Sequence, residues 1–148
     1  SSLNSLGVPL LRFKTGTPVR GNSNSIDFSQ MTRQDGEDDI PPFSFRNEME
    51  GKAVPPAEEQ IPCWSIWTTD ETRQVISENM HRSPLYSGEI KGIGPRYCPS
   101  IEDKIVRFAD KERHQLFLEP EFRDGESIYL QGFSTAMQED IQDWILTV

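Results

Sequence analysis

The sequence predicts an α+β fold with a mixed or antiparallel sheet and a few helices. Strand-like segments are separated by short turns and by helical segments, and they do not follow the strict strand–helix–strand rhythm of a parallel sheet. At 148 residues the chain is long enough to bury the core of one domain. Its hydrophobic content of 34% and mean hydropathy of -0.61 are low for a self-contained globule. The composition therefore predicts a part of a larger protein.

The first sixty residues are mostly polar. A strand is expected over residues 10–14 and a tight turn over 15–18, where a glycine and a proline interrupt the pattern. Residues 19–60 are rich in Ser, Asn, Asp, Glu and Pro, which predicts a long surface excursion. We therefore divide the chain into a strand and turn over 1–18, the polar excursion over 19–60, and an α+β portion over 61–148.

The portion from residue 61 onward carries the regular patterns. A strand over 61–68 leads into a helix over 70–80, for which Thr68 and Glu71 form a capping-box pair. Apolar residues at helical spacing predict two more helices, and two β-forming runs around a glycine turn predict two more strands. These later elements are a helix over 99–110, strands over 114–119 and 126–131, and a helix over 138–146.

One run of fifteen residues is the most informative part of the chain. Pro99 and Ser100 favour a helix start, because proline fits the first turn and serine caps free N–H groups. Cys98 then lies just outside a helix N-terminus with Arg96 nearby, which stabilises a thiolate; the alternative is an ordinary buried cysteine. The run consists of Gly94, Pro95, Arg96, Tyr97, Cys98, Pro99, Ser100, Ile101, Glu102, Asp103, Lys104, Ile105, Val106, Arg107 and Phe108.

Charge and cysteine content restrict the function classes. The net charge is -9, yet residues 1–26 carry three basic groups and no acid, so a local basic site could contact phosphates; the alternative is a solvated face.

Two cysteines make no disulfide framework, and a reduced cytoplasmic setting follows. The long gaps between Cys63, His81, Cys98 and His114 argue against a metal site. No apolar run is long enough for a membrane span, and residues 1–11 lack a secretory signal.

The fifteen-residue run resembles the signature of the GidA/MnmG family, flavoenzymes that modify C5 of the wobble uridine in tRNA. Members are several times longer, so the resemblance implies an internal piece. The neighbourhood departs from the family at Ala136 and Gln138, where a serine and a proline are usual, and at Trp67. Further stretches that resemble the family are Arg12–Pro18, Ile26–Ser29, Pro42–Phe45, Ile61–Cys63, His81–Pro84 and Phe117–Pro120.

The resemblance implies roles for three groups of residues. Cys98 would act on the uracil ring, either by adding to C6 or by moving protons at C5. Residues 94–108 would bind the nicotinamide cofactor, with Arg96 and Lys104 meeting pyrophosphate beside helix-start N–H groups; the alternative leaves Glu102 and Lys104 as exposed helix residues. The turn that joins the flavin domain would contact flavin or phosphate, or would simply end a strand; it contains Lys14, Thr15, Gly16 and Thr17.

The same resemblance implies the complete enzyme. This chain would be the substrate-side part of a larger FAD-dependent protein of Rossmann type. The enzyme would use FAD, NADH and methylene-tetrahydrofolate to place a carboxymethylaminomethyl or aminomethyl group on the uridine. Its partners would be the tRNA anticodon arm and an MnmE-like GTPase, and it would be a cytoplasmic homodimer without a membrane partner. We expect the isolated chain to be inactive. The alternative is a non-catalytic module that binds tRNA or a partner protein.

Overall fold

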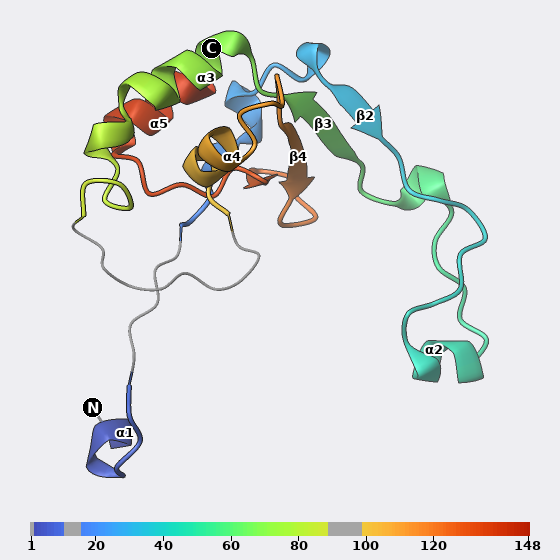
Figure 1. Ribbon diagram of the computed structural model, residues 1–148. Helices are drawn as coiled ribbons and strands as arrows, with labels where there is room; N and C mark the ends of the chain where they lie inside the picture. The colour runs from blue at the N-terminus through green and yellow to red at the C-terminus, as the bar shows by residue number, and fades with distance from the viewer. Residues whose placement is uncertain (1, 11–15, 89–98) are drawn as a thin grey trace. The chain divides into compact units, whose positions relative to one another are not determined.

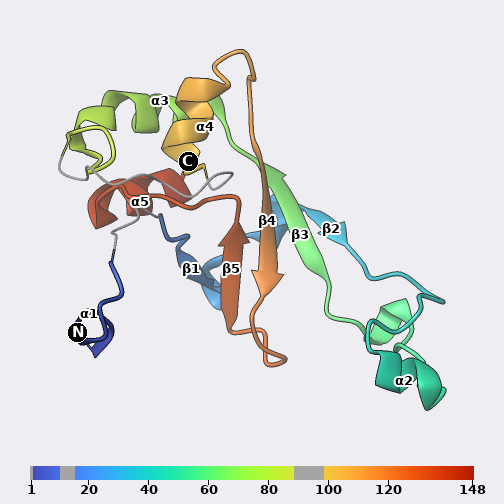
Figure 2. The same ribbon diagram turned by 60° about the horizontal axis from the view of Figure 1, so that its bottom comes forward.

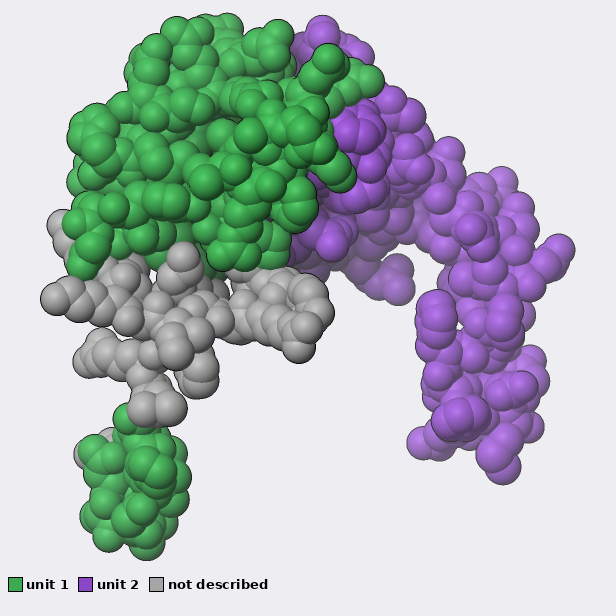
Figure 3. Space-filling view, in the orientation of Figure 1, with its two compact units in different colours: residues 1–19, 68–114, 132–148 green, residues 20–67, 115–131 purple. Residues whose placement is uncertain are grey.

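The computed structural model describes residues 2–10, 16–88 and 99–148 (Figure 1). The chain forms two compact units, which Figure 3 colours separately. Unit 1 comprises residues 1–19, 68–114 and 132–148, and unit 2 comprises residues 20–67 and 115–131. The longer helices lie in unit 1, whereas unit 2 contains the sheet. Most of the strand expected over 10–14, and the first five residues of the cysteine-bearing run, lie outside the described residues.

Unit 2 is built on a five-stranded sheet in which every strand pairing is antiparallel. The strand order is β1-β5-β4-β3-β2, and Figure 2 shows β5, β4 and β3 side by side. This confirms the predicted α+β class. Apolar side chains alternate along the two central strands, with Leu116 and Leu118 in one and Ile128 and Leu130 in the next buried on the same face. The strands are β1 Arg20–Asn22, β2 Thr32–Gln34, β3 Cys63–Trp67, β4 Gln115–Pro120 and β5 Ser127–Gln131.

The polar range 19–60 supplies both edge strands of this sheet, although the sequence predicted only a surface excursion there. Each of these strands has three residues, which is too short for an alternating pattern to be visible. Residues 20–60 contain no buried side chain, in keeping with their polar composition. The short helices of this range are the 3-10 turns Ser23–Ser25, Phe28–Gln30 and Ala57–Glu59, and the helix α2 Phe45–Met49.

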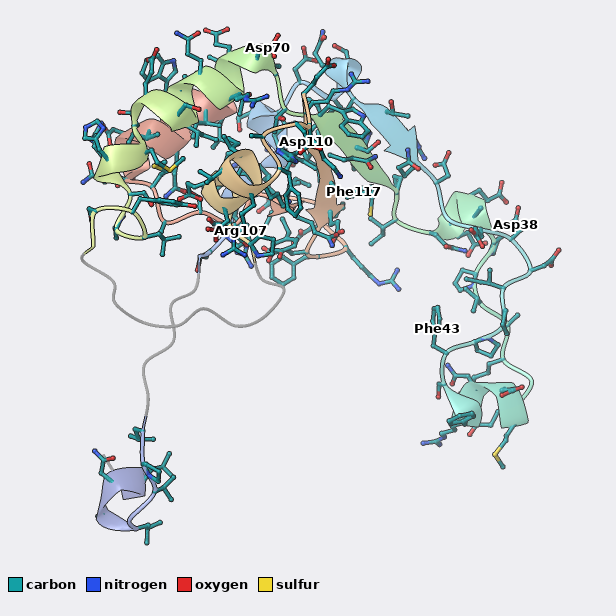
Figure 4. The ribbon with its side chains drawn as sticks, in the orientation of Figure 1. Asp38, Phe43, Asp70, Arg107, Asp110 and Phe117 are labelled. Carbon is teal, nitrogen blue, oxygen red and sulfur yellow. The ribbon has the colours of Figure 1, made fainter. Side chains whose placement is uncertain are left out.

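The two ends of the loop that carries α2 are joined by hydrogen bonds. The backbone N–H of Ala57 donates to Oδ1 of Asp38 over 2.7 Å, and Nε2 of Gln60 donates to the carbonyl of Glu37 over 2.8 Å. We call these contacts the neck of the loop. Beyond the neck, Phe43 is 98% exposed, and Figure 4 labels this residue together with Asp38.

Unit 1 is a group of short helices around an apolar core, in which α3 packs against α4 and α5. Its buried apolar residues are Val75, Ile76, Ile101, Ile105, Phe133, Met137, Ile141 and Ile145. The helices are α1 Ser2–Ser5, α3 Asp70–Glu78, the 3-10 turn Met80–Arg82, α4 Ile101–Arg107 and α5 Glu139–Leu146. Across the described ranges, each helix is too short or too polar to cross a bilayer.

The start of α3 differs from the predicted one. The capping box joins Thr69 and Thr72, rather than Thr68 and Glu71. Thr68 is instead engaged with His114: its Oγ1 accepts from the His114 N–H, and its own N–H donates to the His114 carbonyl, both over 2.9 Å. Because this tertiary contact holds Thr68, the neighbouring threonine becomes the cap. The α4 helix is shorter than the expected 99–110 range, since it ends at Arg107.

Candidate functional site at the start of helix α4

The structure describes only part of the predicted site. Cys98 lies outside the described residues, two positions before Ser100, and so do Lys14 and Thr15. The site residues that are described are Gly16 and Thr17 of the predicted flavin-side turn, and the continuous run Pro99, Ser100, Ile101, Glu102, Asp103, Lys104, Ile105, Val106, Arg107 and Phe108. All of them belong to unit 1.

Ser100 caps α4, as the sequence predicted. Its Oγ accepts from the Asp103 N–H over 3.2 Å, and Oδ2 of Asp103 accepts from the Ser100 N–H over 3.3 Å. Both residues are buried, at 3% and 5% exposure. The hydroxyl of Tyr86 donates to Oδ1 of Asp103 over 2.9 Å. Burial, and then this bond to a carboxylate, raise the pKa of Tyr86 to about 12.

Glu102 is completely buried, so the alternative that it is a solvated helix residue is wrong. Its Oε1 atom accepts from Oγ1 of Thr135 over 2.9 Å and from the Ala136 N–H over 3.0 Å. The Ser83 hydroxyl adds a longer contact of 3.4 Å to the same oxygen. Within the described residues, Oε2 has no hydrogen-bond partner. One carboxylate oxygen thus joins α4 to the segment before α5 and to the turn after α3.

The predicted flavin-side turn meets this same segment. Thr17 and Thr135 form an isolated antiparallel bridge, with N–H to carbonyl bonds of 3.2 and 3.3 Å in the two directions. A side chain at Gly16 would place its Cβ atom 3.0 Å from the Thr135 backbone nitrogen, so glycine allows the two segments to approach. Residues 16–17 and the start of α4, predicted from separate motifs, are therefore connected through Thr135.

The first turn of α4 already uses its polar groups. The Ile101 N–H donates to the Ser134 carbonyl over 2.7 Å, and the N–H groups of Ser100 and Asp103 are engaged in the capping box. These three N–H groups already have partners within the chain, and pyrophosphate binding by residues 99–108 stays a prediction. Cofactor contacts from residues 94–98 stay a prediction.

Lys104 is partly buried and has a definite partner. Its Nζ donates to the Gly132 carbonyl over 2.7 Å, and burial lowers the pKa of the ammonium group. The expected alternative, in which Lys104 is a freely solvated helix residue, is therefore also wrong. Val106 and Phe108 are 50% and 44% exposed, and Arg107 is exposed at the end of the helix (Figure 4).

Sequence reasoning gave no site role to four residues that surround the start of α4: Ser83, Tyr86, Thr135 and Ala136. The available signals were the family-like stretch His81–Pro84, which contains Ser83, and the departure from the family at Ala136. Ala136 stands where the resemblance implies a serine, but its contact to Glu102 uses the backbone N–H, which either residue supplies. Gln138 caps α5 without a side-chain cap bond and accepts instead from Arg82.

The other cysteine lies in unit 2 and has a different environment. Burial, and then the nearby charge of Glu119, raise the pKa of the Cys63 thiol. A raised pKa leaves less thiolate at neutral pH, so Cys63 is a poor nucleophile. The described parts of the chain contain no group of three or more His, Cys, Asp or Glu side chains placed to share a metal ion.

Comparison with known proteins places these features in a family. Two solved structures of Aquifex aeolicus GidA, from crystal forms I and II, match 97% of this chain with TM-scores of 0.79 and 0.77 and sequence identities of 51% and 45%. At these identities, the matches show that this chain has the α+β fold of the corresponding part of these GidA structures. The chain belongs to the glucose inhibited division protein A family, whose model matches residues 1–148.

Curated relatives give the same result. The tRNA uridine 5-carboxymethylaminomethyl modification enzyme MnmG of Caldicellulosiruptor saccharolyticus is 54% identical over 141 residues, which is 95% of this chain. The enzyme of that name from Bacillus thuringiensis strain Al Hakam is 54% identical over 147 residues, or 99% of this chain. The chain spans 22% of the length of each of these relatives and 24% of the form I GidA chain.

Proposed function

We propose that this chain is part of a flavin-dependent enzyme that modifies C5 of the wobble uridine in tRNA. The relatives named as tRNA uridine modification enzymes support the activity. The contacts of Thr135 support a role for this segment in the reaction. The backbone of Thr135 pairs with Thr17 in the turn expected on the flavin side, and its hydroxyl donates to Glu102 in the helix that follows Cys98.

Cys98 is the proposed reactive group. In one route its thiolate adds to C6 of uracil, and the displaced ring electrons make C5 nucleophilic. C5 then attacks an electrophilic carbon, and loss of the C5 proton with expulsion of the thiolate restores the ring and the enzyme. In the other route Cys98 only gives or takes the proton at C5. A thiol at the start of a helix suits both routes, since the helix dipole favours the thiolate.

The cofactors of the complete enzyme would supply what side chains cannot. FAD and NADH would provide hydride chemistry, and methylene-tetrahydrofolate would provide the carbon. The chain's own contribution would be Cys98 as the reactive thiol, with ligand contacts from Arg96, Tyr97 and the turn over 14–17 as the sequence predicts. The tRNA anticodon arm, an MnmE-like GTPase and a second copy of the enzyme are the proposed partners, in the cytoplasm.

The test uses the complete enzyme with Cys98→Ser and, as a matched control, Cys63→Ser. Modified uridine is measured by mass spectrometry of nucleosides from the tRNA, and tRNA affinity is measured separately. We expect Cys98→Ser to abolish modification while affinity stays within about twofold, because the serine hydroxyl is a much weaker nucleophile. Cys63→Ser should remain active. If Cys98→Ser weakened tRNA binding and spared modification, the segment would be a binding module.

The 148-residue chain alone should make no modified uridine when it is supplied with tRNA and all cofactors. The reason is that it spans only 22% of the length of the MnmG relatives. Detection of modified uridine above a no-protein control would contradict this expectation.

A further inference from the structure

The end of helix α4 and the connection from it to β4 carry basic side chains without acidic partners. We propose that this surface of unit 1 binds the phosphate backbone of the substrate tRNA through Arg107 and Lys111, with an unpaired base stacked on Phe108. This inference rests on the proposed function, because it names residues that bind the substrate of that reaction. Arg107, Phe108 and Lys111 are called the α4 basic surface below.

Ion pairing differs between the basic residues of the two units. Salt bridges to nearby carboxylates hold most of the basic side chains of unit 2, namely Arg20, Arg33, Arg46 and Lys52. Among the described residues, no salt bridge includes the basic side chains in and beside α4, namely Arg73, Lys104, Arg107 and Lys111. Positive charge that the protein itself leaves uncompensated attracts an anionic ligand.

The basic side chains beside α4 come from separate elements and converge. Both terminal nitrogens of Arg73 in α3 donate to the connection after α4, over 3.3 Å to the Lys111 carbonyl and 2.8 Å to the Ala109 carbonyl. Burial lowers the pKa of His114, and the charges of neighbouring cations lower it further. These cations are Lys104, Lys111 and Arg73. A phosphate bound among them would relieve their mutual repulsion.

Two of these cations already use their donors within the chain, so they supply charge rather than contacts. Arg73 is bonded to the two carbonyls, and Nζ of Lys104 donates to the Gly132 carbonyl over 2.7 Å. Arg107, which Figure 4 labels, and Lys111 are exposed. Neither of these two side chains donates a hydrogen bond to any described residue. They are therefore the side chains available to contact phosphates.

Phe108 lies between the two available cations in the sequence and is 44% exposed. Nζ of Lys111 lies 5.7 Å from the centre of its ring. Proteins that bind unpaired RNA combine exposed aromatic faces with cations that follow the backbone. Asp110 and Glu112 lie in the same connection, yet residues 104–114 keep an excess of two positive charges. This surface therefore suits an unpaired stretch of RNA.

The experiment measures the affinity of the complete enzyme for tRNA by filter binding, without NADH and methylene-tetrahydrofolate, so that no reaction occurs. The variants are Lys111→Gln and Arg107→Gln, with Lys52→Gln as a control that removes a paired charge from unit 2. Each α4 variant should weaken binding about fourfold at about 0.15 M salt, the loss expected for one phosphate contact. The slope of log affinity against log salt should fall in magnitude by about 0.7. The control should change neither quantity.

Phe108 is tested by its own pair of variants. Phe108→Ala should weaken tRNA binding about tenfold and leave the salt slope unchanged, because stacking is not ionic. Phe108→Tyr keeps an aromatic ring and should bind like the parent. When all cofactors are present, the α4 variants should raise the KM for tRNA by the same factors, while the rate at saturating tRNA stays within about twofold. The two charge variants change exposed side chains, so they keep the test decisive if Phe108→Ala does not fold.

Several results would overturn the proposal. One is that Lys111→Gln and Arg107→Gln weaken tRNA binding no more than Lys52→Gln does. Another is that they leave tRNA binding intact but raise the KM for NADH or weaken binding of the partner GTPase, which would assign the α4 basic surface to the cofactor or to that protein. Affinity is read without turnover, so this inference is separable from the proposed function. If Cys98→Ser proved active while the α4 variants still lost affinity and salt slope, the catalytic role would fail and the binding surface would stand.

Discussion

The junction at the start of α4 and the loop that carries α2 use polar residues in opposite ways. At the junction, Glu102 and Thr135 are buried and bond partners that are distant in the sequence. In the loop, the ion pair between Arg46 and Glu50 is exposed and lies within one helical turn. Buried polar groups are costly to leave unpaired, so they specify one arrangement of several segments. Exposed pairs between residues close in the sequence contribute little to the free energy of folding, and they do not fix the arrangement of distant segments.

The largest difference between these regions should come from apolar substitutions. Ile101→Ala empties a fully buried site in α4 and should lower the free energy of unfolding by about 2–5 kcal/mol. Phe43→Ala removes more atoms from a side chain that is 98% exposed, and should change the free energy by less than about 0.5 kcal/mol. Urea unfolding followed by circular dichroism measures both. A similar loss for the two variants would mean that Phe43 is buried in solution.

Removal of the helix caps compares the regions with one substitution. Ser100→Ala deletes the buried cap of α4 and should cost about 1 kcal/mol or more. Ser44→Ala deletes the exposed cap of α2, whose Oγ accepts from the Asn47 N–H over a long 3.4 Å, and should cost less than about half as much. The same unfolding assay ranks the two. The comparison would break if Ser44→Ala proved the more damaging change.

A smaller effect is expected from Tyr86 at alkaline pH. Its pKa in the folded protein is about 12, above the ordinary value of 10.0. Between these values the folded state binds more protons than the unfolded state, so stability should fall as the pH rises from about 10 to about 12. Tyr86 is 39% exposed, which keeps the contribution small. Tyr86→Phe should make the stability decline less steeply over this range, as followed by unfolding at each pH. An unchanged slope would contradict the contact with Asp103.

The smallest effect should come from the loop ion pair. Arg46→Ala removes a side chain that is 83% exposed, and the unfolding midpoint should not move beyond experimental error. Arg82→Ala provides the comparison in unit 1, because Arg82 contacts Gln138 and, in the first turn of α5, Asp140, and its side chain is 34% exposed. A clear loss in Arg46→Ala, with none in Arg82→Ala, would reverse the contrast between the two regions.

Local patterns predicted the elements whose causes are local. The helices α3, α4 and α5 and the strands β3, β4 and β5 follow from apolar spacing and turn residues, and the Ser100 cap was predicted from residue type. The edge strands were not predicted, because three-residue strands obtain their bonds from the neighbouring strand. The cap of α3 was placed one residue early for a similar reason, since the contact with His114 occupies Thr68.

The candidate site was predictable in its motifs and not in its connections. The cysteine-bearing run and the glycine turn were both selected from sequence. Nothing in their local pattern indicates that Glu102 is buried, since glutamate is seldom buried without a partner, and its partners come from residues 83 and 135–136. Burial of this kind depends on which segments meet in three dimensions, and one sequence read along its length does not contain that information.

Because the neck closes the α2 loop at its base, the loop can be altered without changing the sheet. Contacts from Asp38 to Ala57 and from Glu37 to Gln60 hold the ends of the loop together, and no side chain beyond them is buried. A fluorophore or an affinity tag could therefore be inserted near Phe43 without touching the sheet. Such a probe would give the complete enzyme a spectroscopic handle that leaves Cys98 free for chemistry.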